Sequence, residues 1–453
     1  MVTRLRCRGA QRSPRAALAI PVAMALLLGL VGGPASACPS PDGAPSSDSL
    51  PPDPLLSEQW YLDWLEVPGT PSYGSGVSIG IIDTGVDSDH PDLAPAYDAA
   101  TSRSFLTGNS CDDDPGCGDP GFDGAGHGTG VAGIIAASAD GHGIVGAAPG
   151  ARIVSLKAGD QKGIFTAEAT SQAIRYGADA ELDILVMSFT IDPWFRLCED
   201  APQDTPQERE QQEEDLERIT SALEYASSRG VLLVAASGNK AFDLDNGTED
   251  EYSRWSGQGK RPVTDECVTM PAQFDDAITV GALSKNGTRA PYSNTGTAID
   301  IVAPGGDPVM YDPAGTTLSQ DDAILSAASA DLLRRAGALA DDGTPLTDEI
   351  LHDCPAGPAS CRYYWHESGT SFAAPQVAAA AAILLSQGIL ADEVEDELKS
   401  LASPIPCPPE DQTLVCEDSG DGMSTWYGAG ALQLPHEAIT DSGGQVTAPP
   451  GER

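Results

Sequence analysis

The sequence is short of positive charge. It has 25 lysine and arginine residues against 67 aspartate and glutamate residues, which gives a formal net charge of −42 at pH 7. Such a surface repels phosphate groups and anionic lipid, so the composition argues against a nucleic-acid-binding protein. Five of the arginines fall within residues 1–37, which contain no acidic residue, so removing that segment leaves a net charge of −47.

Long apolar runs are also scarce. The run at 16–31 is interrupted by Pro21 and is too short to span a membrane comfortably. It follows an arginine-rich start and precedes Ala-Ser-Ala at 35–37, which is the order of a secretory signal peptide. We predict that residues 1–37 are a signal peptide cleaved after Ala37, and that the mature chain has no transmembrane helix. An uncleaved membrane anchor is the alternative.

No two cysteines have the C-x-x-C spacing, which argues against a structural zinc site. Cys38 would be the first mature residue, where bacterial lipoproteins carry their lipid, so a lipid anchor at Cys38 is the alternative to a freely secreted protein. The eight cysteines that follow are an even number, as expected for a disulfide set. Pairing neighbours in sequence, where loop closure is cheap, and joining the remaining two predicts Cys111–Cys117, Cys354–Cys361, Cys407–Cys416 and Cys198–Cys267.

The chain divides into segments of different composition. Residues 38–56 are rich in Pro, Ser and Asp and predict a flexible linker. Between 57 and 440, apolar strand-like runs alternate with helical patterns, which predicts an α/β domain with a mainly parallel sheet covered by helices on both faces. Two stretches, near 241–266 and 307–366, interrupt this alternation and are interpreted as insertions, either functional lids or decoration. Residues 441–453 predict a disordered tail.

A helix is predicted from the Ala-rich run that ends at Leu385. Because proline is tolerated only in the first turn of a helix, Pro375 predicts that this helix opens close to Ser371. Gly369 lets the chain turn tightly just before it and leaves room for a ligand. Ser371 is therefore either a helix cap or a nucleophile at the positive end of a helix.

Three other positions supply the partners that a nucleophilic serine needs. Such a serine requires an imidazole to take its proton and a carboxylate to orient the imidazole. Asp83 follows the strand-like run 77–82, and His127 stands where a glycine-rich loop turns into a helix. Asn239 follows another strand-like run through a glycine turn, which would aim its amide at a developing oxyanion.

These positions lie in three sequence blocks: Ile-Asp-Thr-Gly-Val-Asp at 82–87, Gly-His-Gly-Thr at 126–129 and Gly-Thr-Ser-Phe-Ala-Ala-Pro at 369–375. In this order the blocks resemble those of the subtilisin-like serine proteases, the subtilases or peptidase family S8, over about residues 57–440. The resemblance implies a three-layer fold and an extracytoplasmic serine endopeptidase that works through an acyl-enzyme. It further implies a monomer that acts on protein or peptide substrates and needs no cofactor for its chemistry.

Individual roles follow from the same resemblance. Ser371 would attack the scissile carbonyl, His127 would carry the proton, and Asp83 would orient His127. Asn239 and the Ser371 backbone N–H would bind the oxyanion.

The resemblance also implies a substrate site. Substrate would lie beside Ser188, Phe189 and Thr190, with Gly238 and Thr269 completing the pocket for the residue before the cut. Thr190 and Thr269 stand where relatives often carry glycine. Two β-branched side chains should narrow the pocket and favour small residues such as Ala, Val or Thr over Phe or Tyr.

A structural calcium site is implied as well, with Gln59, Asp92 and Asp140 as ligands. Oxygen ligands of this kind suit calcium, although His142 alters the loop beside Asp140. The alternative is that these are ordinary residues of a very acidic surface.

Two other functional classes remain. The first is a catalytically silent, subtilisin-like binding or scaffold protein whose insertions matter more than its triad, although no triad member is lost here. The second is an esterase using the same triad, which is disfavoured because no Gly-x-Ser-x-Gly motif surrounds Ser371.

Overall fold

A computed structural model of the chain describes residues 53–65, 73–111, 116–253, 257, 259–308, 310–311, 317–357, 360–408, 415–420 and 422–434. All of them belong to one compact unit, Ser49–Arg453. The predicted signal peptide, Cys38 and the predicted tail lie outside the described residues. The end of the predicted linker is packed, because the Asp53 carboxylate accepts hydrogen bonds from the backbone of Gly141 and His142 at 3.0 Å each.

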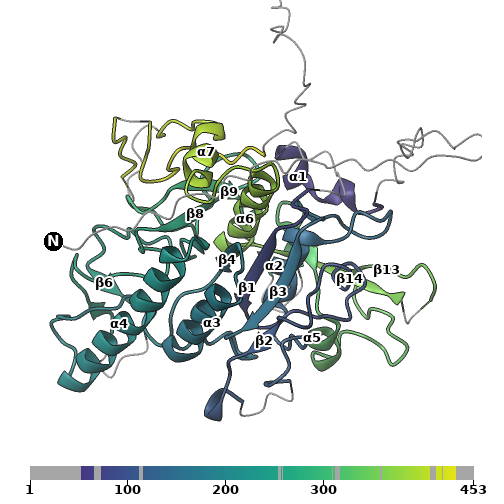
Figure 1. Cartoon of the computed structure of the whole chain (residues 1–453), viewed down its shortest axis with the longest axis horizontal. Helices are drawn as coiled ribbons and strands as arrows, with labels where there is room; N and C mark the ends of the chain where they lie inside the picture. Colours follow the sequence, from purple (N-terminus) through teal and green to yellow (C-terminus); the bar gives the residue numbers. More distant parts are fainter. Residues whose placement is uncertain are drawn as a thin grey trace, which may run out of the picture. The chain divides into compact units, whose positions relative to one another are not determined.

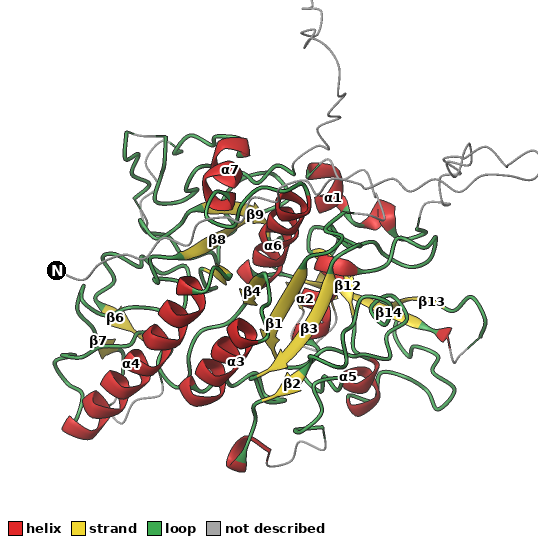
Figure 2. Ribbon diagram, viewed as in Figure 1, coloured by secondary structure: helices red, strands yellow, loops and turns green. Residues whose placement is uncertain are grey.

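The centre of the fold is a seven-stranded parallel sheet, as the alternation of strands and helices predicted (Figure 2). Its central strands β1, β4 and β5 are mostly apolar and are buried along their whole length, which is the usual pattern of a parallel sheet covered on both faces. In spatial order the strands are β2 (Arg103–Ser104), β3 (Arg152–Lys157), β1 (Ser78–Asp83), β4 (Ile184–Met187), β5 (Leu232–Ala236), β8 (Ala277–Leu283) and β9 (Ile301–Pro304).

Helices cover both faces of this sheet, so the predicted three-layer fold is confirmed (Figure 1). Ile79 and Ile81 of β1 pack with α2 (His127–Ala136) and α6 (Thr370–Ser386). Ile82 faces the other way, because successive side chains of a strand alternate, and packs with α3 (Ala167–Asp179) and α4 (Pro206–Ser228). Smaller helices are η1 (Leu56–Glu58), α1 (Trp60–Trp64), η2 (Gly108–Cys111), α5 (Ala330–Arg335) and α7 (Val394–Leu401).

Both predicted insertions contain secondary structure. The first holds the antiparallel pair β6 (Glu249–Asp250) and β7 (Arg261–Pro262). The second forms the pair β10–β11, the sheet β12-β14-β13 and helix α5, with a small apolar core around Leu333, Ile350 and Tyr363. Its strands are β10 (Met310–Tyr311), β11 (Thr317–Ser319), β12 (Ile324–Ala327), β13 (Leu351–Asp353) and β14 (Arg362–Glu367).

All four predicted disulfides are confirmed. Three close loops of 6, 7 or 9 residues, whereas Cys198–Cys267 spans 69 residues and joins the segment after β4 to the end of the first insertion. This longer link fastens the segment that runs between β4 and α4.

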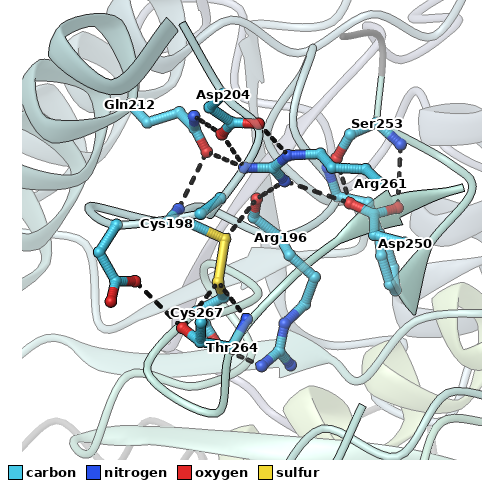
Figure 3. The surroundings of a disulfide bond; sticks show 12 residues. Arg196, Cys198, Asp204, Gln212, Asp250, Ser253, Arg261, Thr264 and Cys267 are labelled. Atoms are coloured by element: carbon cyan, nitrogen blue, oxygen red, sulfur yellow. Dashed lines mark hydrogen bonds and ion pairs between the residues drawn. A yellow bond between two sulfur atoms is a disulfide. The ribbon is translucent and has the colours of Figure 1, made fainter. Parts of the chain in front are cut away.

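A fully buried arginine lies beside this disulfide (Figure 3). Arg261 donates to both carboxylate oxygens of Asp204, at 3.0 and 2.6 Å, and to Gln212 at 2.6 Å. It also donates to the Arg196 carbonyl at 2.7 Å and pairs with Asp250 at 3.5 Å. The side chains of Arg261, Asp204 and Asp250 are each 0% exposed. The Arg261–Asp204 pair therefore links the first insertion to the body of the domain inside the interior.

We expect Arg261→Met to lower the free energy of unfolding by about 3–5 kcal/mol, because it leaves two carboxylates buried without a cation. Denaturant unfolding followed by circular dichroism measures this loss. Lys260→Met is the matched control, since Lys260 is 55% exposed and lies 3.7 and 3.8 Å from its carboxylate partners. Equal stability of the two variants would contradict the structural role of Arg261.

Candidate active site

The candidate site lies where the strand order of the sheet reverses. From β1 the chain continues on one side to β3 and later returns to the other side to form β4. Open parallel sheets bind ligands at the carboxyl ends of the strands at such a switch point. Asp83 is the last residue of β1, Ser188 directly follows β4, and Asn239 follows β5 by three residues.

Asp83 and His127 form a hydrogen-bonded pair, as predicted. The Nδ1 atom of His127 lies 2.8 and 3.0 Å from the two carboxylate oxygens of Asp83, whose side chain is 1% exposed. The helix must approach the strand closely for this contact. Gly128 permits it, because a Cβ atom there would lie 2.0 Å from the carbonyl oxygen of Gly85.

A second carboxylate, not singled out from the sequence, holds the first turn of α2. Asp123 accepts hydrogen bonds from the backbone of Gly126 and from both the backbone and hydroxyl of Thr129, at 2.7–2.9 Å. The hydroxyl of Thr84, the residue next to Asp83, donates a hydrogen bond to the Asp123 carboxylate at 2.8 Å. Asp123 is therefore a positioning residue for His127. The signal in the sequence is an aspartate within one turn of a helix start, where free N–H groups favour it.

The charge around His127 favours its protonated form. Burial alone would lower the pKa of His127. The charge and the hydrogen bond of Asp83 oppose this effect, and the nearby charges of Glu367 and Asp123 add to them, so the pKa of His127 is raised to about 9. The side chain is 30% exposed, so protons reach it from solvent. With Nδ1 bound to Asp83, the other ring nitrogen, Nε2, is the one available for proton transfer.

Ser371 lies in the first turn of α6, which begins at Thr370 and has Gly369 at its cap with φ 152°. The helix thus starts one residue before Ser371, and Pro375 falls in its second turn, not its first as predicted. Pro375 has no N–H to donate to the carbonyl of Ser371, and the hydroxyl of Ser188 donates to that carbonyl instead, at 3.1 Å. The Ser371 hydroxyl in turn donates to the Ser188 carbonyl at 3.0 Å.

The amide of Asn239 has a defined orientation. Its oxygen accepts hydrogen bonds from the backbone N–H and the hydroxyl of Thr370, at 2.8 and 2.9 Å. Two donors on the oxygen leave the NH₂ group of Asn239 on the opposite side, as an oxyanion donor requires. The backbone N–H of Gly238 donates a hydrogen bond to the Thr370 hydroxyl at 3.1 Å.

A groove of about 720 Å³ brings these residues together. His127, Ser371 and Asn239 line it, and so do four of the five predicted substrate-binding residues, which are Ser188, Phe189, Thr190 and Gly238. Thr269 does not line it. Thr269 is fully buried and donates to the carbonyl of Phe195 at 3.1 Å, and Phe195 itself forms the wall.

Aromatic residues that no signature block contains shape the rest of this groove. Phe165 stacks on Phe189 with ring centroids 4.1 Å apart, and Phe195 meets Tyr252 edge-on at 5.4 Å. The second insertion adds Leu332 and Arg335 from α5 to the lining. Arg335 donates to the carbonyl of Gly124 at 3.0 Å, three residues before His127. Sequence reasoning missed Tyr252, Leu332 and Arg335 because they lie in the insertions, which no signature block covers. Phe165 and Phe195 lie outside the insertions, but they too are far in sequence from the three blocks.

The predicted calcium ligands do not assemble into a metal site. The amide oxygen of Gln59 accepts from the Val145 backbone at 2.9 Å, while Asp92 and Asp140 both pair with Arg362. In the part of the chain that the structure describes, no group of three or more His, Cys, Asp or Glu side chains is arranged to hold a metal ion.

Known proteins are similar to this chain in sequence and in fold. The sequence profile of the subtilase family matches residues 74–402. Subtilisin Savinase from Lederbergia lenta is 30% identical over 252 residues, which are 55% of this chain and 72% of that protein. An intracellular serine protease from Paenibacillus polymyxa is 30% identical over 242 residues, 53% of this chain, and the match spans 60% of that protein's length.

Solved structures match the fold over a greater share of the chain. A protease from Pseudoalteromonas arctica PAMC 21717 superposes with a TM-score of 0.57 at 22% identity, covering 85% of this chain and 97% of that one. The nisin leader peptidase NisP from Lactococcus lactis gives a TM-score of 0.55 at 23% identity, covering 78% of this chain and 90% of that one. At these identities the likeness supports the fold alone.

We expect an NMR titration to give His127 a pKa well above that of an ordinary histidine, near 9. Asp83→Asn should lower this pKa toward the ordinary histidine value of about 6.5, because burial is then opposed only by the more weakly acting Glu367 and Asp123. Asp89→Asn removes a charge from an exposed residue nearby and is the control. A His127 pKa that is the same in wild type and Asp83→Asn would rule out the pairing.

Proposed function

This chain belongs to the subtilase family of serine proteases, and on that premise we propose that it is a secreted serine endopeptidase acting through Asp83, His127 and Ser371. The observation that carries the proposal is the buried Asp83–His127 pair, which opens onto the same groove as Ser371. Protein or peptide chains are the proposed substrates. The chemistry needs no cofactor, because these side chains supply nucleophile, base and orienting charge, and the enzyme works as a monomer.

The proposed reaction begins with a rotation of the Ser371 hydroxyl away from the Ser188 carbonyl and toward Nε2 of His127. His127 takes the proton as the serine oxygen attacks the peptide carbonyl, and Asp83 stabilises the imidazolium. The oxyanion accepts hydrogen bonds from the Asn239 amide and the Ser371 N–H, and Thr370 holds that amide in place. His127 then protonates the leaving amine, and water hydrolyses the acyl-enzyme by the reverse sequence.

Secretion is part of the proposal. It is supported by the signal-peptide pattern at 1–37 and by four disulfides, which form and persist in oxidising surroundings. Among the described residues no helix has both the length and the apolar character needed to cross a bilayer. Lipid attachment at Cys38, which would hold the same enzyme at a membrane surface, is the alternative form of this proposal.

We expect a fluorophosphonate probe to label the folded wild type at Ser371 and to leave Ser371→Ala unlabelled. The labelling rate should rise with pH through the pKa of His127, because only the neutral imidazole can take the serine proton. Mass spectrometry locates the adduct. A folded wild type that resists the probe from pH 7 to above that pKa would favour the silent scaffold protein. A labelled enzyme that cleaves simple esters but no peptide would favour the esterase.

We further propose that the pocket for the residue before the cut accepts small side chains. Thr190 and Gly238 line the groove, and so does Phe195, whose backbone carbonyl accepts a hydrogen bond from the buried Thr269. A β-branched residue and an aromatic ring leave less room than two glycines would, so steric cost disfavours large substrate side chains.

On a matched peptide series, wild type should cleave after Ala or Val faster than after Phe. Thr190→Gly should shift the ratio of kcat/KM for Phe over Ala upward by about tenfold or more, since it removes a wall of the pocket. Thr269→Ser keeps the hydroxyl that holds Phe195 and should leave the ratio unchanged. A wild type that prefers Phe, or a larger effect at Thr269 than at Thr190, would contradict this pocket.

A further inference from the structure

An arginine from the second insertion reaches the place expected for calcium. Arg362 is the first residue of β14, and its side chain is 8% exposed. Its Nε atom lies 2.6 Å from Asp92, whose side chain is 0% exposed, and one terminal nitrogen donates to Asp140 at 2.9 Å. The other terminal nitrogen lies 3.7 Å from Asp353 of β13. One guanidinium thus faces three carboxylates from three separate segments.

With Arg362 in place, the residues around it do not fit a calcium ion. Calcium takes six to eight oxygen ligands at about 2.3–2.6 Å. Gln59 uses its amide on the backbone of Val145 in both directions, accepting at 2.9 Å and donating at 2.8 Å. One carboxylate oxygen of Asp92 pairs with Arg362. The other accepts a hydrogen bond from the Tyr364 hydroxyl at 2.6 Å. A metal ion would have to displace the arginine first.

The guanidinium supplies the positive charge that a bound metal ion would otherwise place beside Asp92. A buried carboxylate such as Asp92 is costly unless a cation accompanies it. Arg362 supplies that cation on the chain itself, and its planar fork reaches several carboxylates at once. It therefore neutralises Asp92 and links the segments that carry Asp140 and Asp353.

These contacts hold the far end of the helix that carries His127. Asp140 lies in the loop that follows α2, and the backbone of this loop also bonds to the start of the described chain through Asp53 and Leu55. Leu55 donates to the carbonyl of Gly143 at 2.9 Å. The arginine closes the same loop from the side of the insertion, so α2 is anchored at both ends.

We propose that Arg362 is the resident cation of this loop, so that the second insertion does by a side chain what a bound calcium ion would do. The fold then keeps its stability in calcium-free surroundings. This inference concerns stability and stands whether or not the proposed peptidase activity is correct.

The test compares melting temperatures with a calcium chelator and with millimolar calcium. Wild type should melt at the same temperature in both. Arg362→Met should melt roughly 5–10 °C lower in chelator, because Asp92 is left buried without a cation. Calcium should restore several degrees to Arg362→Met, whereas magnesium should not, since it prefers a smaller, strictly octahedral site.

Two further variants make the result specific. Arg334→Met also removes an arginine from the insertion, but Arg334 is 63% exposed and lies 3.8 Å from its partner Asp331, so it should behave as wild type. Arg362→Met/Asp92→Asn removes the unpaired charge, and should melt above Arg362→Met and lose the calcium response. If Arg362→Met fails to fold, Arg362→Lys keeps a positive charge and should fold with a smaller loss.

Three results would overturn the proposal. The first is a wild type that loses stability in chelator or gains it with calcium. The second is an Arg362→Met variant whose melting temperature equals that of Arg334→Met. The third is an Arg362→Met variant that folds with reduced stability but does not respond to calcium, which would make Arg362 a packing residue and not a substitute for a cation.

Discussion

The structure depends on one constraint, which is that a charged side chain buried in it must lie beside a partner that binds it. Asp83 is removed from water at the end of a central strand, and it is tolerated there because His127 and the backbone of Thr84 bind it. The same burial strengthens the attraction between carboxylate and imidazole. Helix α2 can approach strand β1 this closely because Gly128 has no side chain. The Asp83–His127 contact therefore depends on the backbone at Gly128.

The two insertions repeat this solution at a distance from the groove. Arg261 in the first and Arg362 in the second are cations carried into the interior by short strands, and each meets carboxylates from other segments. In a chain with so few basic residues, these arginines neutralise acids that would otherwise repel one another. A very acidic surface and a well-paired interior are therefore compatible in one domain.

The sequence predicted best where local chemistry leaves few choices. Asp83 ends a strand, Asn239 follows one through a glycine turn and His127 opens a helix, as their local sequence predicted. Short sequence separation was enough to pair three disulfides. The errors have long-range causes. Thr269 was aligned as a pocket wall, but the segment carrying Phe195 covers it. Pro375 was expected in a first turn, and a tertiary hydrogen bond from Ser188 permits it in the second.

The second insertion touches the candidate site from two directions. Its helix α5 brings Arg335 to the groove, and its strand β14 brings Arg362 to the loop behind α2. Between them, residues 336–350 run largely over the surface, with Leu346 65% exposed, and exposed loop tips are where proteases cut. One cleavage there would loosen the wall of the groove and the support of the helix that carries His127 together. An intact surface loop is therefore a condition for keeping both supports in place.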